Sequence, residues 1–147
     1  MRYSLTPLAA ALSLFVAATA SEAQSTDASA AGKLTIELNK LEPGEGGACR
    51  AFFLFRNQTA TSLEGFEMSL AILNRDGVID RLLTVDAAPL PVSRTTLKLF
   101  EIPETACDSV SQILVHDFAS CKPQNGAETD CFSMIELKSR ASAQLVD

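Results

Sequence analysis

The stretch that decides the fold is FEMSLAILNRDGVIDRLLTV, residues 66–85. Apolar side chains occupy positions 66, 68, 70 and 72, with polar or small side chains between them, and this period of two is typical of a half-buried β-strand. Asp76-Gly77 then lies between two apolar runs, and this dipeptide favours a tight hairpin because glycine readily adopts a positive φ. The stretch therefore predicts two antiparallel strands, residues 67–74 and 78–85.

Short strand patterns recur on both sides of this hairpin. They cover residues 34–39, 49–57, 95–102, 110–118 and a short last segment within 141–146, and glycine- or proline-rich turns separate several of them. Residues 129–137 suit either a short helix after Cys131 or a strand. Six to seven short strands without a long helical pattern predict an all-β, antiparallel, immunoglobulin/fibronectin-like β-sandwich, with a single domain over residues 33–147.

The N-terminus resembles a Sec-type secretory signal. Arg2 precedes an apolar run, Leu8 to Ala20, which is too short to span a bilayer comfortably. Small residues follow, so we expect cleavage after Ala23, with Ala20 as the second choice and an uncleaved membrane anchor as the alternative. Residues 1–23 are thus a predicted signal peptide and residues 24–32 a flexible leader. A periplasmic or secreted protein without stable membrane insertion is expected.

The net charge of −6 limits the classes of partner. Nucleic acid and anionic lipid surfaces both attract basic proteins, so neither is an expected partner. The seven arginines do include Arg50, Arg56, Arg75, Arg81 and Arg94, a set that could form a local basic patch. Solvated positions on a sheet face, or charges that protect a sheet edge, explain the same residues more simply.

The four cysteines all follow the predicted cleavage point, and an even count in an exported chain indicates disulfides. Cys121 and Cys131 enclose one polar loop, which favours a local bond and leaves Cys49 for Cys107. The chain-entropy contribution is about 3 kcal/mol for the short ring and about 4 kcal/mol for the long one. The spacing does not fit a structural zinc site or a Cys-x-x-Cys redox site, so no metal or cofactor is expected.

Three other motifs have a structural interpretation beside a functional one. His116 could act as a general base, but on a strand its neighbour Asp117 points to the opposite face, and we expect residues 110, 112, 114, 116 and 118 to share one face. The sequence NRDGVID offers oxygen ligands for calcium but lacks the closing glutamate. Asn57-Gln58-Thr59 is a glycosylation triplet, and the sequence leaves open whether Asn57 is modified.

Several segments together resemble a family of small exported bacterial proteins. They are the aromatic strand that opens with Cys49-Arg50, EMSLAILNRDGVIDRLL, LPVSRTTLKLFEIPETAC, ILVHDFASC and the final LKSR. Members are usually described as Tat-signal-containing or hypothetical proteins, although this chain lacks the twin arginines of such a signal. The hairpin is also similar to that of FxLYD-type exported sandwich modules. The resemblance implies an exported sandwich and no catalytic residue.

These observations lead to one main functional prediction and two alternatives. The main one is a non-enzymatic, disulfide-stapled binding or interaction module of the cell envelope, with an envelope protein or a small ligand as partner. The first alternative is a thiol-redox or hydrolytic enzyme that uses Cys121 and Cys131 or His116. The second is a structural component of the envelope that exposes an edge strand for pairing.

Overall fold

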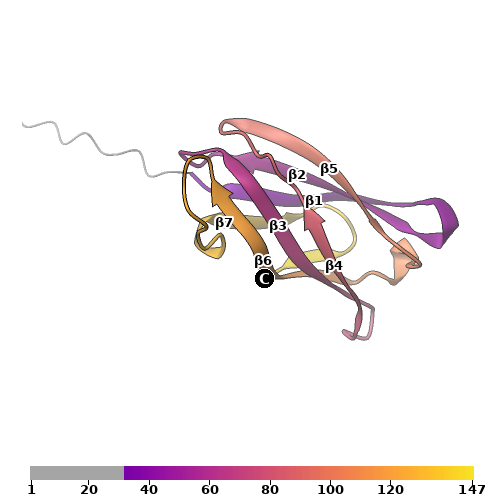
Figure 1. The fold of residues 1–147 in the computed structure, drawn as a ribbon. Helices are drawn as coiled ribbons and strands as arrows, with labels where there is room; N and C mark the ends of the chain where they lie inside the picture. Colours follow the sequence, from indigo (N-terminus) through magenta and orange to yellow (C-terminus); the bar gives the residue numbers. More distant parts are fainter. Residues whose placement is uncertain (1–31) are drawn as a thin grey trace, which may run out of the picture.

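The computed structural model describes residues 32–147, which form two four-stranded sheets packed as a sandwich (Figure 1). The predicted signal peptide and all of the predicted leader except Gly32 lie outside the described residues. The strands are β1 Leu34–Pro43, β2 Cys49–Asn57, β3 Leu63–Leu73, β4 Ile79–Asp86, β5 Arg94–Ile102, β6 Gln112–Pro123, β7 Ile135–Ser139 and β8 Gln144–Val146. No helix within residues 32–147 is long and apolar enough to cross a membrane.

The sheet topology confirms the all-β sandwich and corrects its details. One sheet has the order β5-β2-β1-β7 and the other the order β4-β3-β6-β8. The sheets are mixed rather than purely antiparallel, because β7 pairs parallel to β1 and β8 pairs parallel to β6. The eight strands exceed the six to seven expected because the last part of the chain contributes two short ones. Apolar alternation does not encode strand direction, so the parallel pairs could not be predicted from it.

The segment after Cys131 contains both of the structures that its sequence allowed. Phe132–Met134 forms a single 3-10 turn, and β7 follows it directly. On the other side of the loop, β6 continues to Pro123, so Cys121 lies on a strand rather than at the start of a loop. Pairing with β3 extends the strand, since Cys121 is the register partner of Phe66.

The predicted hairpin is confirmed in its strands and its turn. The apolar side chains of β3 at positions 66, 68, 70 and 72 are buried. In the turn, the Asn74 side-chain oxygen accepts hydrogen bonds from the amides of Asp76 and Val78 at 3.0 and 3.1 Å. Gly77 has a φ of 74°, the left-handed conformation that glycine adopts at least cost. Residues 74–77 of the sequence considered for calcium therefore build the turn itself, while Asp80 lies on β4.

A chain of phenylalanine rings connects the two sheets through the core. Successive ring centroids lie 4.8–6.2 Å apart, within the range for favourable aromatic pairs. The chain starts on β5, crosses β2, passes to β3 and β6 in the second sheet, and ends at the 3-10 turn: Phe100, Phe53, Phe55, Phe66, Phe118 and Phe132. The aromatic contacts therefore extend from the core to Phe132, the residue that follows Cys131, which is itself 38% exposed.

The strands place the connections at two opposite ends of the sandwich (Figure 1). We define the leader end as residues 32–33, 56–62, 87–95 and 120–134, the connections and flanking strand ends that lie where the described chain begins. The hairpin end comprises residues 44–48, 74–78 and 103–111. Each end holds one disulfide bond.

Candidate functional site

The structure forms the two disulfides predicted from the sequence. Cys49 bonds to Cys107 at the hairpin end, with a Cα–Cα distance of 4.9 Å and a sequence separation of 58. The bond joins the first residue of β2 to the 3-10 turn Cys107–Ser109, which leads from β5 in one sheet to β6 in the other. It therefore ties together segments that are remote in the chain.

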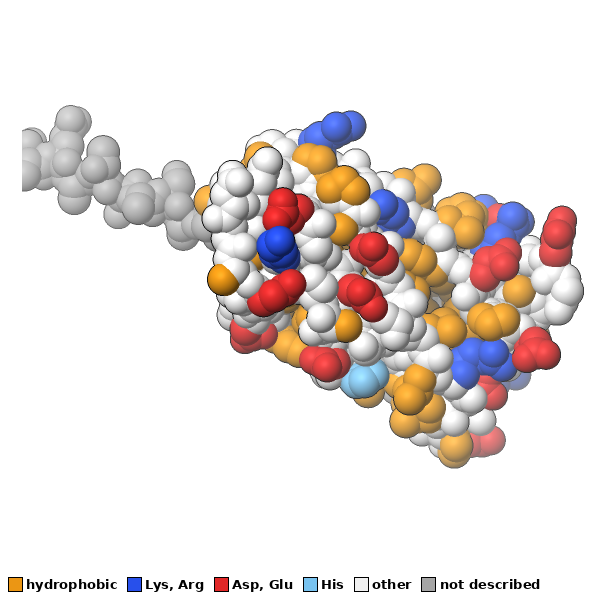
Figure 2. Space-filling view, viewed as in Figure 1, with side chains coloured by type: hydrophobic (Ala, Val, Ile, Leu, Met, Phe, Trp, Pro, Cys, Tyr) orange, Lys and Arg blue, Asp and Glu red, His pale blue; other side chains and the backbone are white. Residues whose placement is uncertain are grey.

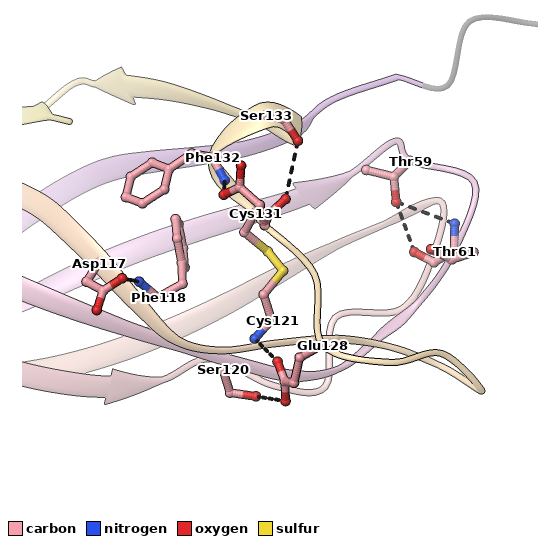
Figure 3. The surroundings of a disulfide bond; sticks show 11 residues. Thr59, Thr61, Asp117, Phe118, Ser120, Cys121, Glu128, Cys131, Phe132 and Ser133 are labelled. Carbon is pink, nitrogen blue, oxygen red and sulfur yellow. Dashed lines mark hydrogen bonds between the residues drawn. A yellow bond between two sulfur atoms is a disulfide. The ribbon is translucent and has the colours of Figure 1, made fainter.

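At the leader end, Cys121 bonds to Cys131 across a separation of 10 residues, and both side chains are buried. Figure 3 shows Glu128 reaching back from the loop to the strand. One of its carboxylate oxygens accepts a hydrogen bond from the Ser120 hydroxyl at 3.0 Å, and the other accepts the Cys121 amide at 2.7 Å. The Thr129 amide donates to the Cys121 carbonyl at 2.9 Å. The base of the loop is thus held by more than the disulfide.

The tip of this loop has a different character from its base. Residues 124–130 are all exposed, and Asn125 has a φ of 59°, the left-handed conformation that asparagine tolerates better than most residues. The Gln124 amide still donates to the Ser62 carbonyl at 2.8 Å, which attaches the tip to the neighbouring β2–β3 loop. The loop therefore presents polar residues from a fixed position.

Asn57 organises the β2–β3 loop from inside the protein. Its side-chain amide donates to the carbonyls of Thr61 and Leu90, and its side-chain oxygen accepts both the amide and the hydroxyl of Thr59. All four hydrogen bonds are made inside the protein, where Asn57 is only 1% exposed. The glycosylation triplet is thus the start of a structured turn, and a glycan on this nitrogen would have to displace it from its buried site.

Two open hollows flank the β2–β3 loop. The larger, of about 410 Å³, is lined by Arg56–Gln58 at the end of β2 and Ser93–Thr95 at the start of β5. The other, of about 270 Å³, is lined by residues 32–33, 59–61 and 133–134. The β2–β3 loop therefore contributes residues to both hollows.

The five arginines that could form one basic patch are separated in the structure. Arg56 and Arg94 line the larger hollow, together with Gln58, Ser93 and Thr95, which the sequence did not single out. Arg75 lies in the hairpin turn at the other end of the domain. The missing information was the pairing of β2 with β5, which places Asn57 opposite Arg94 and is not visible in either strand alone.

Glu37 supplies a buried negative charge on the outer face of the same sheet. It is 4% exposed, and hydrogen bonding from the Asn39 side chain at 2.8 Å is the largest cause that lowers its pKa below the usual value. The nearby charges of Arg140, whose Nε lies 3.3 Å from the carboxylate, and of Arg56 act in the same direction, against the effect of burial. The group is therefore stabilised as a carboxylate.

His116 lies apart from the disulfides and from any partner carboxylate. It is exposed, as the single pale-blue side chain in Figure 2 shows, and it falls at a register shift between β6 and β3. Within residues 32–147, no hydrogen bond or ion pair joins it to an acidic residue. The prediction that residues 110–118 alternate regularly is wrong, because the shift turns Phe118 inward against Phe66.

The cysteine and metal chemistry of the described residues is limited. All four cysteines are in disulfides, so the part of the chain from 32 to 147 contains no free thiol. The same part contains no group of three or more histidine, cysteine, aspartate or glutamate side chains that could hold a metal ion. The described surface offers open hollows at both ends. Beside the pair at the leader end, the hairpin end has one of about 320 Å³, lined by residues 43–44, 47–48 and 106–108, and one of about 200 Å³, lined by residues 74–76 and 108–109.

Comparison with known proteins gives a likeness of fold. No family model matches the chain, and no curated protein matches it. Among solved structures, the chain is similar to IrmA from Escherichia coli, with a TM-score of 0.56 and 14% sequence identity over 71% of this chain and 90% of that one. At this identity the likeness shows that the two proteins share a fold and nothing about activity.

Proposed function

We propose that this protein is an exported, non-enzymatic binding module and that the leader end is its contact surface. The observation that carries the proposal is the meeting of four chain segments at that end, where hydrogen bonds and the Cys121–Cys131 disulfide hold the loops in place. Loops that are positioned by a rigid scaffold are the usual binding elements of such folds. Because these loops are already ordered before binding, they lose less conformational entropy on association.

Two features support export and a location in the periplasm or outside the cell. Disulfides persist in oxidising compartments, and the structure has two of them, each with buried or half-buried cysteines. The N-terminal sequence has the features of a signal peptide. We infer that the protein folds and works in the cell envelope or the medium, where an envelope protein or a small ligand would be its partner.

The proposal is tested with matched substitutions at the two ends. Ala60 is exposed in the β2–β3 loop, and Ala106 is exposed in the β5–β6 connection. The oxidised exported protein and its variants Ala60→Glu and Ala106→Glu are immobilised and incubated with periplasmic extract and with extracellular medium. We expect a component that the wild type and Ala106→Glu retain and that Ala60→Glu loses. Retention by all three proteins alike, or by none, would contradict the proposal.

The enzyme alternative has its own test. A thiol-redox role requires Cys121 or Cys131 to cycle between thiol and disulfide, and a hydrolytic role requires His116 to be in place. In the presence of a mild reductant, we expect the folded protein to show no reaction with a thiol-alkylating reagent and the unfolded protein to react. Labelling of one or both of these cysteines in the folded protein under mild reduction would favour the redox enzyme over the binding module.

A structural envelope component is the second candidate, and the edges of the sheets favour it. β4 and β5 are each an edge strand of their sheet, and large apolar side chains on them are exposed. They are Ile79 and Leu82 on β4 and Leu97 and Leu99 on β5, with exposed fractions of 44–64%. Unpaired edge strands can add further strands. A molecular mass in light scattering that rises with concentration would support this candidate.

A further inference from the structure

The outer face of the β5-β2-β1-β7 sheet carries an apolar patch at the β5 edge. Antiparallel pairing sets Phe52 of β2 opposite Leu99 of β5. Two residues further along, it sets Leu54 opposite Leu97. These side chains alternate along their strands with residues that face the core, so they point away from the second sheet. Leu97 and Leu99 are 59% and 44% exposed, and the other two are half-buried. A contiguous exposed apolar patch indicates an interaction surface.

The patch adjoins backbone groups that can pair with a further strand. β5 pairs with β2 on one side only and forms the edge of its sheet (Figure 1). On an edge strand, every second residue points its N–H and C=O groups away from the sheet. A strand that pairs with these groups continues the sheet, and its own outer side chains then lie beside Leu97 and Leu99. The best occupant is therefore a strand with apolar side chains at alternate positions.

The charged side chains of the same outer face fall into two groups. Most of them are in ion pairs: Glu37, Lys40, Glu42, Arg50, Glu136 and Lys138. Among residues 32–147, Arg56 and Glu101 have no ion-pair partner within 4.0 Å. They cannot pair with each other in one molecule, because Arg56 lies opposite Thr95, about 20 Å along β5 from Glu101. One positive and one negative charge thus remain at the two ends of the patch.

We propose that the occupant is a second copy of this chain, whose β5 pairs antiparallel with β5 across a two-fold axis at Lys98. This register sets Leu97 opposite the partner's Leu99 on both sides of the axis, so the two apolar patches become one. An axis one residue earlier sets Thr95 opposite the partner's Leu99. An axis one residue later sets Leu97 opposite the partner's Glu101. Each of these alternatives places a polar side chain against an apolar one, which favours the axis at Lys98.

The same register gives both of the remaining charges a partner. It sets Thr95 opposite the partner's Glu101, and Arg56 is the neighbour of Thr95 on β2. Arg56 and the partner's Glu101 are then two strand spacings apart, about 10 Å, which two long side chains can span together. The two-fold axis repeats the pair, so the interface contains two ion pairs of opposite charge. Such an interface is complete with two copies and does not lead to an open chain of copies.

Lys98 is the residue that opposes this pairing. It lies opposite Phe53, so it points to the core side of the sheet, where a lysine on an edge strand commonly hinders an added strand. Its ammonium group donates to the Ala88 carbonyl of its own domain at 3.0 Å. In the dimer, the two lysines are therefore opposite each other in register but bonded to separate carbonyls. Their repulsion lowers the affinity. We expect a dissociation constant between micromolar and millimolar.

The test exchanges the two charges and measures association by sedimentation velocity at constant ionic strength. Arg56→Glu alone and Glu101→Arg alone each face like charges twice across the axis, so we expect each to dimerise about tenfold more weakly than the wild type or worse. In an equimolar mixture, a dimer of one copy of each variant restores opposite charges in both pairs. We expect this mixture to dimerise as the wild type does. No recovery in the mixture, or a wild type that stays monomeric, would overturn the proposal.

A matched pair of leucine variants assigns the association to β5. Leu97 and Leu82 are similarly exposed, at 59% and 64%, on the edge strands of the two sheets. We expect Leu97→Glu to abolish the dimer, because it places a charge within the joined apolar patch, and Leu82→Glu to leave it unchanged. The apparent mass of the wild type should level off at twice the monomer mass. An equal loss in Leu82→Glu, or a mass that rises beyond the dimer, would overturn the closed β5 interface.

Failure of this interface and failure of the binding module can be told apart. If the wild type stays monomeric while Ala60→Glu alone loses the retained component, the dimer is wrong and the binding module stands. If the mixed charge variants dimerise and no component distinguishes Ala60→Glu from Ala106→Glu, the dimer stands and the function of the leader end is wrong. Unfolding midpoints of all variants in urea confirm that each compared protein is folded.

Discussion

The two ends of the sandwich use the same residue types for different purposes. Each end has a disulfide, but the one at the hairpin end spans 58 residues and the one at the leader end spans 10. Arg75 of the hairpin end pairs with Asp108, whereas Arg56 and Arg94, around the larger hollow of the leader end, have no carboxylate within 4.0 Å among residues 32–147. The arginine of the hairpin end thus lies near a carboxylate, in an ion pair whose two side chains are 71% and 81% exposed, whereas the two arginines beside the larger hollow do not.

The difference shows how a small sandwich can separate stability from recognition. A long-range bond restricts the unfolded chain more than a short one does, so the hairpin end contributes more to the stability of the whole domain. A local ring constrains mainly its own loop, which suits a surface that must keep one shape. Removing these features one at a time tests whether stability and recognition are divided between the two ends.

The long-range disulfide has the largest expected effect on stability. The double variant Cys49→Ser/Cys107→Ser loses about 4 kcal/mol of unfolding free energy, because the unfolded chain regains the entropy that a ring of this size removes. Urea unfolding followed by circular dichroism measures the loss. A loss below about 1 kcal/mol would mean that the unfolded chain is already compact at this end.

The local disulfide has a smaller and more confined effect. Cys121→Ser/Cys131→Ser lowers the unfolding free energy by about 3 kcal/mol on the same estimate. Hydrogen exchange should accelerate first at the amides of Cys121 and Thr129, which bond Glu128 and the Cys121 carbonyl. Amides of β2 near Cys49 are the internal control. Equal acceleration at both places would show that the two ends unfold as one unit.

The buried amide of Asn57 is the next largest contribution at the leader end. Asn57→Ala removes four hydrogen bonds, and the carbonyls of Thr61 and Leu90 each lose one donor. We expect the free energy of unfolding to fall by about 2 kcal/mol. Gln58→Ala, at the exposed neighbour, changes the stability by no more than about 0.5 kcal/mol. Similar losses in both variants would contradict the role given to the Asn57 side chain.

The smallest effect is the pH dependence that Glu37 contributes. Its pKa is lower in the folded protein than in the unfolded chain, so its stabilising contribution is present above the unfolded pKa and is lost as pH falls through the folded pKa. Urea midpoints measured from neutral pH into the acid range should therefore fall more steeply for the wild type than for Glu37→Gln. The two proteins should converge at the acid end. Parallel curves would show that Glu37 does not carry this dependence.

Glu42→Gln is the comparison for this measurement. The pKa of Glu42 is also lowered, first by a hydrogen bond from Lys40 and then by the charges of Lys40 and Arg50. Its side chain is 28% exposed, against 5% for Glu37, so solvent screens its interactions more. We expect Glu42→Gln to flatten the acid dependence less than Glu37→Gln does.

Much of the strand framework followed from local patterns. The alternation in residues 66–73 and the Asp76-Gly77 turn predicted β3, β4 and their hairpin, because burial of one strand face and a positive φ are local requirements. The cysteine pairing followed from spacing and from the positions of the strands. Strand order, the parallel pairs and the bulge that turns Phe118 inward depend on contacts between distant segments.

The candidate site was the feature of the protein that the sequence predicted least well. Arg56 and Arg94 were both visible in the sequence, but so were Arg50, Arg75 and Arg81, and nothing local separates the two groups. Their separation depends on which carboxylates the fold places nearby, as Asp108 beside Arg75 illustrates. Ser93, Thr95 and Gln58 carry no pattern of their own and become relevant only through the β2–β5 register.

The sequence by itself determined an all-β sandwich with two disulfides, since alternation, turn residues and cysteine spacing act over short distances along the chain. Only the tertiary structure decided which arginines pair with a carboxylate, because ion pairing depends on distances between residues that are far apart in the sequence. Arg75 and Asp108 are 33 positions apart, and Glu37 and Arg140 are 103 positions apart. The same reason explains why the hollow at the leader end emerges only when β2 and β5 lie side by side.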